Sequence, residues 1–116
     1  MLMGKLMHES AGRGIEIDDR TLAHLRLVIM NKLRRGEAFM FDIDMPDSGG
    51  HRILWIHASM PLALYFYGSR QPRINREWLE ALMAAANSPA GLTIVPEPPE
   101  RTDDIRRRGE DSFLTE

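Results

Sequence analysis

The fold class follows from residues 37–67, EAFMFDIDMPDSGGHRILWIHASMPLALYFY, which contain three segments with the pattern of β-strands. In the first, 37–44, apolar and polar side chains alternate, as they do in a strand with one buried face. A turn rich in glycine follows, then a second segment at 51–57, and after Met60-Pro61 a third that ends at Tyr67. Because the connections are short, these segments predict an antiparallel meander.

Two helices flank the three segments. Asp18 or Asp19 is a good N-cap for the first helix, which is expected to run through about Arg35 before Gly36. Asn75 is an equally good N-cap for the second helix.

Three shorter strands complete the pattern, at 5–9, 15–17 and 92–95, the first two forming a hairpin. The predicted order is β-β-α-β-β-β-α-β. This order predicts a single α+β domain, with a mainly antiparallel sheet and two helices packed on one face.

The alternation assigns the apolar residues of the sheet to a buried face: Phe39, Phe41, Ile43, Leu54, Ile56, Leu62, Leu64 and Phe66. The opposite face then carries Asp42, Asp44, Ile53, Trp55, His57, Tyr65 and Tyr67. The first helix has a wide apolar arc, so we expect it to be deeply buried or covered on two sides, for example by a partner subunit.

Composition restricts the class of protein. A chain of 116 residues with 43% hydrophobic residues and a net charge of −2 suits one globular domain. The chain has no cysteine, which favours a cytoplasmic location, and neither a signal peptide nor a membrane span is expected. Residues 1–96 are predicted to form the domain, and the charged, proline-rich residues 97–116 a disordered tail. Its basic cluster, 106–108, fits either a docking peptide or a solvated terminus.

Three arginines precede the second helix, and they are the best candidates for an anion site. Arg70, Arg73 and Arg76 stand within seven residues, and Asn75 lies beside the free N–H groups of the helix start. This pattern predicts phosphate or carboxylate binding. The alternative is that these arginines are solvated, or paired with nearby acids that include those of the tail. Such surface ion pairs contribute little to stability.

The predicted outer face carries three large aromatic residues, Trp55, Tyr65 and Tyr67. Exposed aromatic rings on a sheet can stack nucleic-acid bases or bury against a protein partner. The alternative is that they pack against a second subunit or the terminal hairpin. The two aspartates on this face disfavour phosphates.

No catalytic constellation is recognisable. The chain lacks the nucleophile elbow of hydrolases, the phosphate-binding P-loop and the dinucleotide fingerprint, so neither catalytic residues nor cofactors are expected. His51 and His57 lie about 20 Å apart on one strand and cannot share a metal. A metal-dependent enzyme that uses Asp42, Asp44 and His57 is therefore only a third hypothesis, and no metal site is predicted.

Six segments carry a resemblance to known sequences: 3–6, 17–25, 32–37, 68–70, 75–76 with Trp78, and 86–98. Through them the chain resembles a family of short, uncharacterised actinobacterial proteins that share a domain of unknown function. Members of that family often carry the label "ATP-dependent DNA ligase". A ligase needs a lysine nucleophile, usually in K-x-D-G, and neither Lys5 nor Lys32 has that context. The resemblance therefore implies at most an accessory role near DNA.

Together these patterns predict a small, non-catalytic binding module that forms a homodimer or binds a protein partner. The alternative is an accessory protein that binds nucleic acid or phosphate through the arginine loop and the aromatic face.

Overall fold

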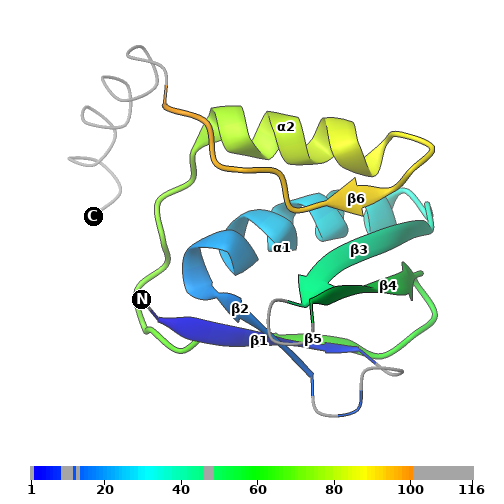
Figure 1. Ribbon diagram of the computed structural model, residues 1–116, viewed down its shortest axis with the longest axis horizontal. Coiled ribbons are helices and arrows are strands. Elements are labelled where there is room, and N and C mark those ends of the chain that lie inside the picture. Colours follow the sequence, from blue (N-terminus) through cyan, green and yellow to red (C-terminus); the bar gives the residue numbers. More distant parts are fainter. Residues whose placement is uncertain (1, 9–11, 13, 46–48, 101–116) are drawn as a thin grey trace.

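The computed structural model describes residues 2–8, 12, 14–45 and 49–100, and this part of the chain contains two helices and six strands. In chain order they are β1 (Met3–His8), β2 (Ile15–Asp18), α1 (Asp19–Arg34), β3 (Phe39–Met45), β4 (Gly50–Ile56), β5 (Leu62–Tyr65), α2 (Arg76–Ala86) and β6 (Leu92–Thr93) (Figure 1). The predicted α+β class and the predicted order of the elements are both confirmed.

Local capping explains where the helices begin and end. The carboxylate of Asp18 accepts a hydrogen bond from the Thr21 N–H at 3.1 Å, which satisfies one free donor at the start of α1. Gly36 follows α1 with a φ of 71°, a left-handed conformation that suits glycine. Asn75 caps α2 as predicted, accepting hydrogen bonds from the N–H groups of Glu77 and Trp78.

The wide apolar arc of α1 is covered on two sides within the chain. α1 lies between α2 and the sheet that contains β1 and β2 (Figure 1). Leu22, Leu25 and Val28 are fully buried, whereas Met30 stays partly exposed. A partner subunit is therefore not needed to explain most of this helix.

The strands form two three-stranded sheets, in the orders β2-β1-β5 and β4-β3-β6. The predicted meander is correct for β3 and β4, which pair antiparallel, but wrong for β5, which pairs with β1. A turn at 57–60, where the Met60 N–H donates to the His57 carbonyl at 3.5 Å, carries the chain away from β4. β6 is shorter than expected and pairs with β3 in parallel.

The predicted buried face is found mainly on β3 and β4. Phe39, Phe41, Ile43, Leu54 and Ile56 are all buried. The three apolar residues expected from the third strand, Leu62, Leu64 and Phe66, are partly buried and pack against this core.

After β6 the chain returns along α2 toward the N-terminal end of that helix (Figure 1). The indole N–H of Trp78 donates to the Val95 carbonyl at 2.8 Å, and the Asn75 amide donates to the Pro98 carbonyl at 2.8 Å. We call residues 94–100 the C-terminal strap. The rest of the predicted tail, with its basic cluster at 106–108, lies outside the described residues. Within the described ranges, no helix is long and apolar enough to cross a membrane.

Candidate binding surfaces

The loop between β5 and α2 is held in place by one buried carboxylate. Asp19, the first residue of α1, accepts hydrogen bonds from the backbone N–H groups of Tyr67 at 3.0 Å and Gly68 at 2.8 Å. Gly68 also allows close packing, because a Cβ at this position would lie 2.7 Å from the Leu2 side chain. The start of the arginine-rich loop is therefore fixed to the helix beneath it.

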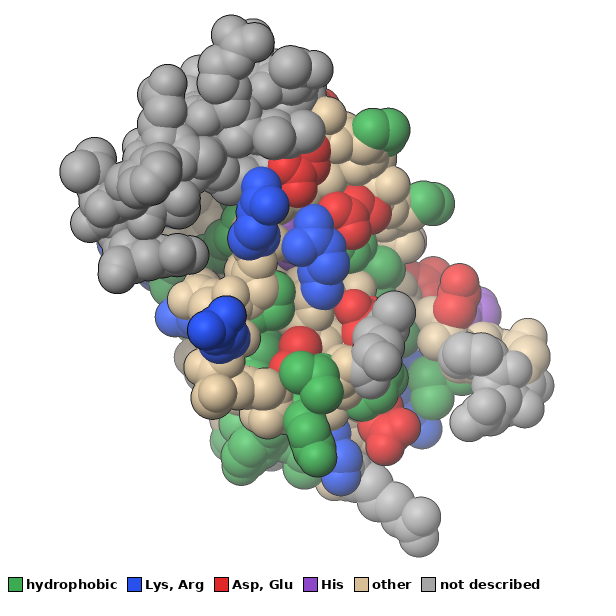
Figure 2. Space-filling model, turned by 90° about the vertical axis from the view of Figure 1, so that its left-hand side faces the viewer, with side chains coloured by type: hydrophobic (Ala, Val, Ile, Leu, Met, Phe, Trp, Pro, Cys, Tyr) green, Lys and Arg blue, Asp and Glu red, His purple; other side chains and the backbone are tan. Residues whose placement is uncertain are grey.

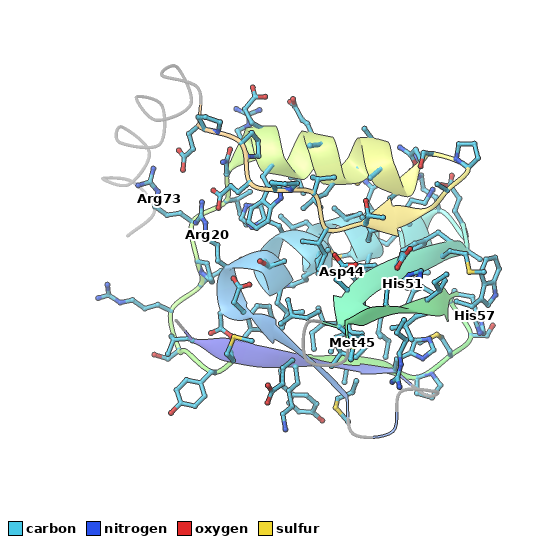
Figure 3. The ribbon with its side chains drawn as sticks, in the orientation of Figure 1. Arg20, Asp44, Met45, His51, His57 and Arg73 are labelled. Carbon is cyan, nitrogen blue, oxygen red and sulfur yellow. The ribbon has the colours of Figure 1, made fainter. Side chains whose placement is uncertain are left out.

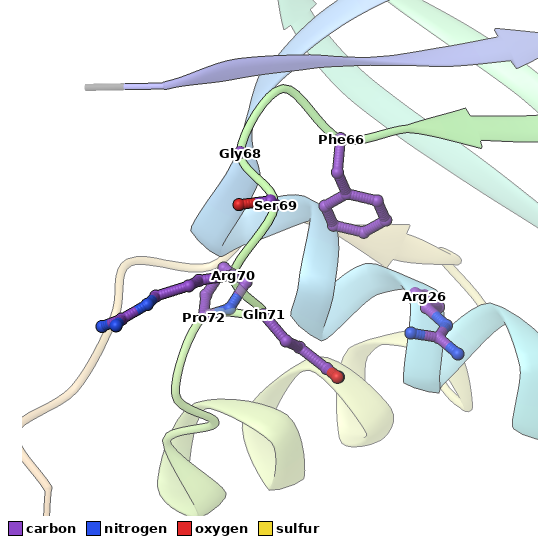
Figure 4. Close-up of a pocket in the computed structure, with 7 residues that line it drawn as sticks. All are labelled: Arg26, Phe66, Gly68, Ser69, Arg70, Gln71 and Pro72. Carbon is purple, nitrogen blue, oxygen red and sulfur yellow. The ribbon is translucent and has the colours of Figure 1, made fainter. Parts of the chain in front are cut away.

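A hollow of about 180 Å³ lies between this loop and α1 (Figure 4). It is lined by Arg26, Phe66, Gly68, Ser69, Arg70, Gln71 and Pro72, with no acidic residue among them. Figure 4 shows the side chain of Gln71 extending toward that of Arg26, with the ring of Phe66 above and apart from their ends, whereas Arg70 points the opposite way. No local sequence pattern points to Arg26, because it lies on α1, forty residues before Phe66 of the loop.

The other members of the predicted anion site lie next to carboxylates of the strap. Asn75 is only 1% exposed, and its amide group donates to Glu97 at 2.9 Å and to the Pro98 carbonyl. Arg73 is exposed and lies 3.7 Å from Glu100. Arg76, at the first position of α2, is also exposed. The structure therefore separates Arg70, beside the hollow, from Arg73 and Asn75, beside the strap.

Arg20 is the charged residue that holds the strap. Its guanidinium donates two hydrogen bonds to the Glu97 carboxylate, at 2.9 and 2.5 Å, and a third to the Arg73 carbonyl at 2.8 Å. Figure 3 places Arg20 and Arg73 close together at this end of the molecule, and Figure 2 shows basic and acidic side chains adjoining on the same side. The hydrogen bonds from Arg20 lower the pKa of Glu97 to about 2, and the Asn75 amide acts in the same direction.

A second surface is the outer face of the β3–β4 sheet, where strand register brings apolar side chains together. Met40 lies opposite Trp55, and Ile53 is two residues from Trp55 on the same face. The side chains of Met40, Trp55 and Ile53 are 45%, 52% and 51% exposed, respectively. We call them the apolar patch.

Polar residues continue this face beyond the apolar patch. Asp42 lies opposite Ile53, Asp44 lies opposite His51, and the His51 ring contacts the Asp42 carboxylate at 2.6 Å. The hydrogen bond with Asp42 raises the pKa of His51. The outer face therefore combines the apolar patch with one acid–histidine pair.

The remaining predicted aromatics belong to the other sheet. Tyr65 on β5 lies opposite Lys5 on β1 and is 59% exposed, and Tyr67 just beyond β5 is 75% exposed. The predicted set of Trp55, Tyr65 and Tyr67 is thus divided between two sheets. Whether any of these rings binds a base or a partner stays a prediction.

The three residues of the metal hypothesis are not brought together by the register. Asp42 contacts His51 rather than His57. Asp44 lies opposite His51 near the start of β4, whereas His57 comes just after the end of β4 (Figure 3). Among the described residues, no group of three or more histidines and carboxylates could hold a metal ion.

Comparison with known proteins places the chain in a family. The family model called Domain of unknown function (DUF7882) matches residues 3–97, so the chain belongs to that family. This confirms the predicted resemblance to a family with a domain of unknown function, whereas its actinobacterial origin and ligase label stay predictions. No curated protein and no solved structure matches the chain.

Proposed function

We propose that this member of the DUF7882 family is a small binding module that self-associates through β4 and the apolar patch beside it. The observation that carries this proposal is the exposure of Met40, Ile53 and Trp55 at adjacent positions of one sheet face. Fully burying an exposed apolar side chain of this size is worth about 1.5–3 kcal/mol, and because these three are already about half-buried, each can add roughly half of that to a complex. Tryptophan in particular is enriched among the residues that dominate binding energies.

The position of β4 supports a second copy of the chain as the partner. β4 is seven residues long and lies at the edge of its sheet. Among the described residues no strand pairs with its outward side, where the Trp55 carbonyl bonds to the His8 side chain. An antiparallel pair of identical edge strands is self-complementary and forms a closed dimer.

One side-chain contact defines how such strands would align. The ring N–H of His8 at Nε2 donates to the Trp55 carbonyl at 2.9 Å, so this carbonyl points away from β3. In an antiparallel ladder every second residue directs its backbone groups to the same side. The backbone N–H and carbonyl groups of His51 and Ile53 therefore also point away from β3. A twofold axis at Ile53 then places Ile53 opposite Ile53 of the partner subunit, and Trp55 opposite the partner subunit's His51. In this pairing the His8 side chain has to release the Trp55 carbonyl to the partner strand.

The test is sedimentation velocity of the full chain from low to high micromolar concentration. We expect a monomer–dimer equilibrium that shifts toward monomer in Ile53→Asp and Trp55→Asp, because each variant places a carboxylate in the contact. Tyr67→Asp is the matched control, since it adds the same charge at an exposed aromatic position outside β4. A monomeric wild type, or a dimer that both β4 variants leave unchanged, would overturn the proposal.

Nucleic-acid binding through Arg70, Arg73 and Arg76 is a second candidate function. It is favoured by the exposure of all three arginines, whereas the proximity of Glu97 and Glu100 to Arg73 and Asn75 weakens it. Phosphate contacts make binding fall steeply with salt. Salt-dependent binding of single-stranded DNA that Arg70→Ala reduces would support this candidate, and no binding at low salt would exclude it.

A further inference from the structure

The hollow between α1 and residues 66–72 combines positive charge with an apolar ring. Arg26 comes from α1, and the other lining residues come from the loop (Figure 4). Within the described part of the chain, neither Arg26 nor Arg70 forms an ion pair with a carboxylate. The positive charge of Arg26 is thus available to a ligand in the hollow.

The carboxylate of Asp19, which contacts the backbone of this loop, already has hydrogen-bond partners. Both oxygens of Asp19 accept hydrogen bonds from the loop, one from the Tyr67 N–H and one from the Gly68 N–H. Asp19 is buried, so these bonds fix the loop from below instead of neutralising a side chain in the hollow. A fixed loop loses little conformational freedom when a ligand binds.

The donor set indicates the chemistry of the ligand. A guanidinium offers parallel N–H groups that match the two oxygens of a carboxylate or phosphate, and the Gln71 amide can add a further donor. The ring of Phe66 lines the same hollow and offers a flat apolar contact (Figure 4). A volume of about 180 Å³ is below the roughly 300–1,000 Å³ of drug-sized sites, so the ligand is small.

We propose that this hollow binds a small organic oxyanion, in which a phosphate or carboxylate contacts Arg26 and Gln71 and an attached apolar group contacts Phe66. Arg70 points away from this contact, so it contributes to the local potential without touching the ligand. This site lies on α1 and the loop, so it does not depend on the proposed self-association through β4.

The test is a titration of the full chain followed by backbone and arginine-side-chain NMR, with phenyl phosphate, benzoate, inorganic phosphate and phenol as probes. We expect shifts at residues 66–71 and at the Arg26 side chain, with phenyl phosphate or benzoate binding more tightly than inorganic phosphate. The neutral phenol should not bind detectably. Phenyl phosphate and benzoate distinguish a phosphate site from a carboxylate site, and a preference for either supports the proposal.

Matched variants test each contact. Arg26→Gln should weaken binding of the preferred aromatic anion by roughly tenfold, as expected for loss of a charge-assisted hydrogen bond. Arg34→Gln, an exposed arginine on the same helix, is the control and should leave the affinity unchanged. Phe66→Leu should bring the affinity of the aromatic anion close to that of inorganic phosphate.

Three results would overturn the proposal: no shifts with any anion, equal effects of the Arg26 and Arg34 variants, or equal affinity for inorganic phosphate and both aromatic anions. Thermal unfolding of each variant shows whether it is folded, and Arg26 is exposed, so its replacement leaves the core intact. Ile53→Asp should bind the anion normally, so failure of one proposal can be separated from failure of the other.

Discussion

At the scale of single residues, the strongest electrostatic feature is Glu97. Two hydrogen bonds from Arg20 and one from Asn75 stabilise its ionised form and lower its pKa from 4.5 to about 2. A group whose pKa is lower in the folded state stabilises the protein above its unfolded pKa. That stabilisation is lost as the pH falls from about 4.5 toward 2.

We therefore expect Glu97→Gln to reduce the acid sensitivity of the protein. At pH 7 this variant should be less stable than the wild type by about 1 kcal/mol or less, because the pair is partly exposed. At pH 3 the difference should be smaller, since the wild-type carboxylate begins to lose its advantage. Urea unfolding at both pH values measures this, with the exposed Glu80→Gln as control. An equal difference at both pH values would contradict the expectation.

At the scale of elements, Asn75 connects the start of α2 to two other parts of the chain. Its side-chain oxygen caps the helix, its amide donates to Glu97 and Pro98, and its backbone N–H donates to Nε2 of His24 at 2.8 Å. Because Nε2 accepts this bond, the proton of a neutral His24 lies on Nδ1, which donates to the Arg20 carbonyl at 2.7 Å. One loop residue thus joins α1, α2 and the C-terminal strap.

We expect Asn75→Ala to lower the free energy of unfolding by about 2–3 kcal/mol, about 1 from the lost cap and the rest from the lost amide bonds. Asn75→Asp keeps a cap oxygen but loses the amide donors and brings a second carboxylate near Glu97. It should therefore also destabilise the protein, whereas a role as cap alone would leave it near wild type. Chemical denaturation of both variants, beside the exposed Asn31→Ala, distinguishes these outcomes.

At the scale of the whole molecule, the C-terminal strap links elements that the strand pairing leaves apart. It contacts Trp78 and Asn75 at the start of α2 and Arg20 at the start of α1. The sequence predicts that the domain ends at residue 96, yet Glu97 and Pro98 make several of these contacts. The strap therefore offers a direct test of the domain boundary.

We expect a chain that ends at Glu100 to be more stable than a chain that ends at Pro96, by about 1–3 kcal/mol, because only the longer chain keeps the hydrogen bonds of Glu97 and Pro98. Thermal and urea unfolding of the two truncated chains measures this difference. Equal stability would show that the domain ends at residue 96, as the sequence predicts. The variant Arg20→Gln in the longer chain should reproduce part of the loss.

The sequence by itself determined the elements of this protein, because helices and strands are specified by short-range patterns. Alternation identifies β3 and β4, and the caps at Asp18 and Asn75 locate both helices within a residue or two. Pairing is different, since it depends on which apolar faces meet once the whole chain is packed. Only the tertiary structure decided that β5 pairs with β1, and so divided the predicted aromatic face between two sheets.

The same physical reason applies to the candidate sites. Arg20 and Glu97 are 77 residues apart, and Arg26 is forty residues from Phe66, so no local pattern connects either pair. The sequence identified the arginine-rich loop and the exposed aromatic residues, because residue type and alternation are local properties. Which arginine faces a carboxylate and which faces the hollow was decided by how α1, the loop and the C-terminal strap pack together.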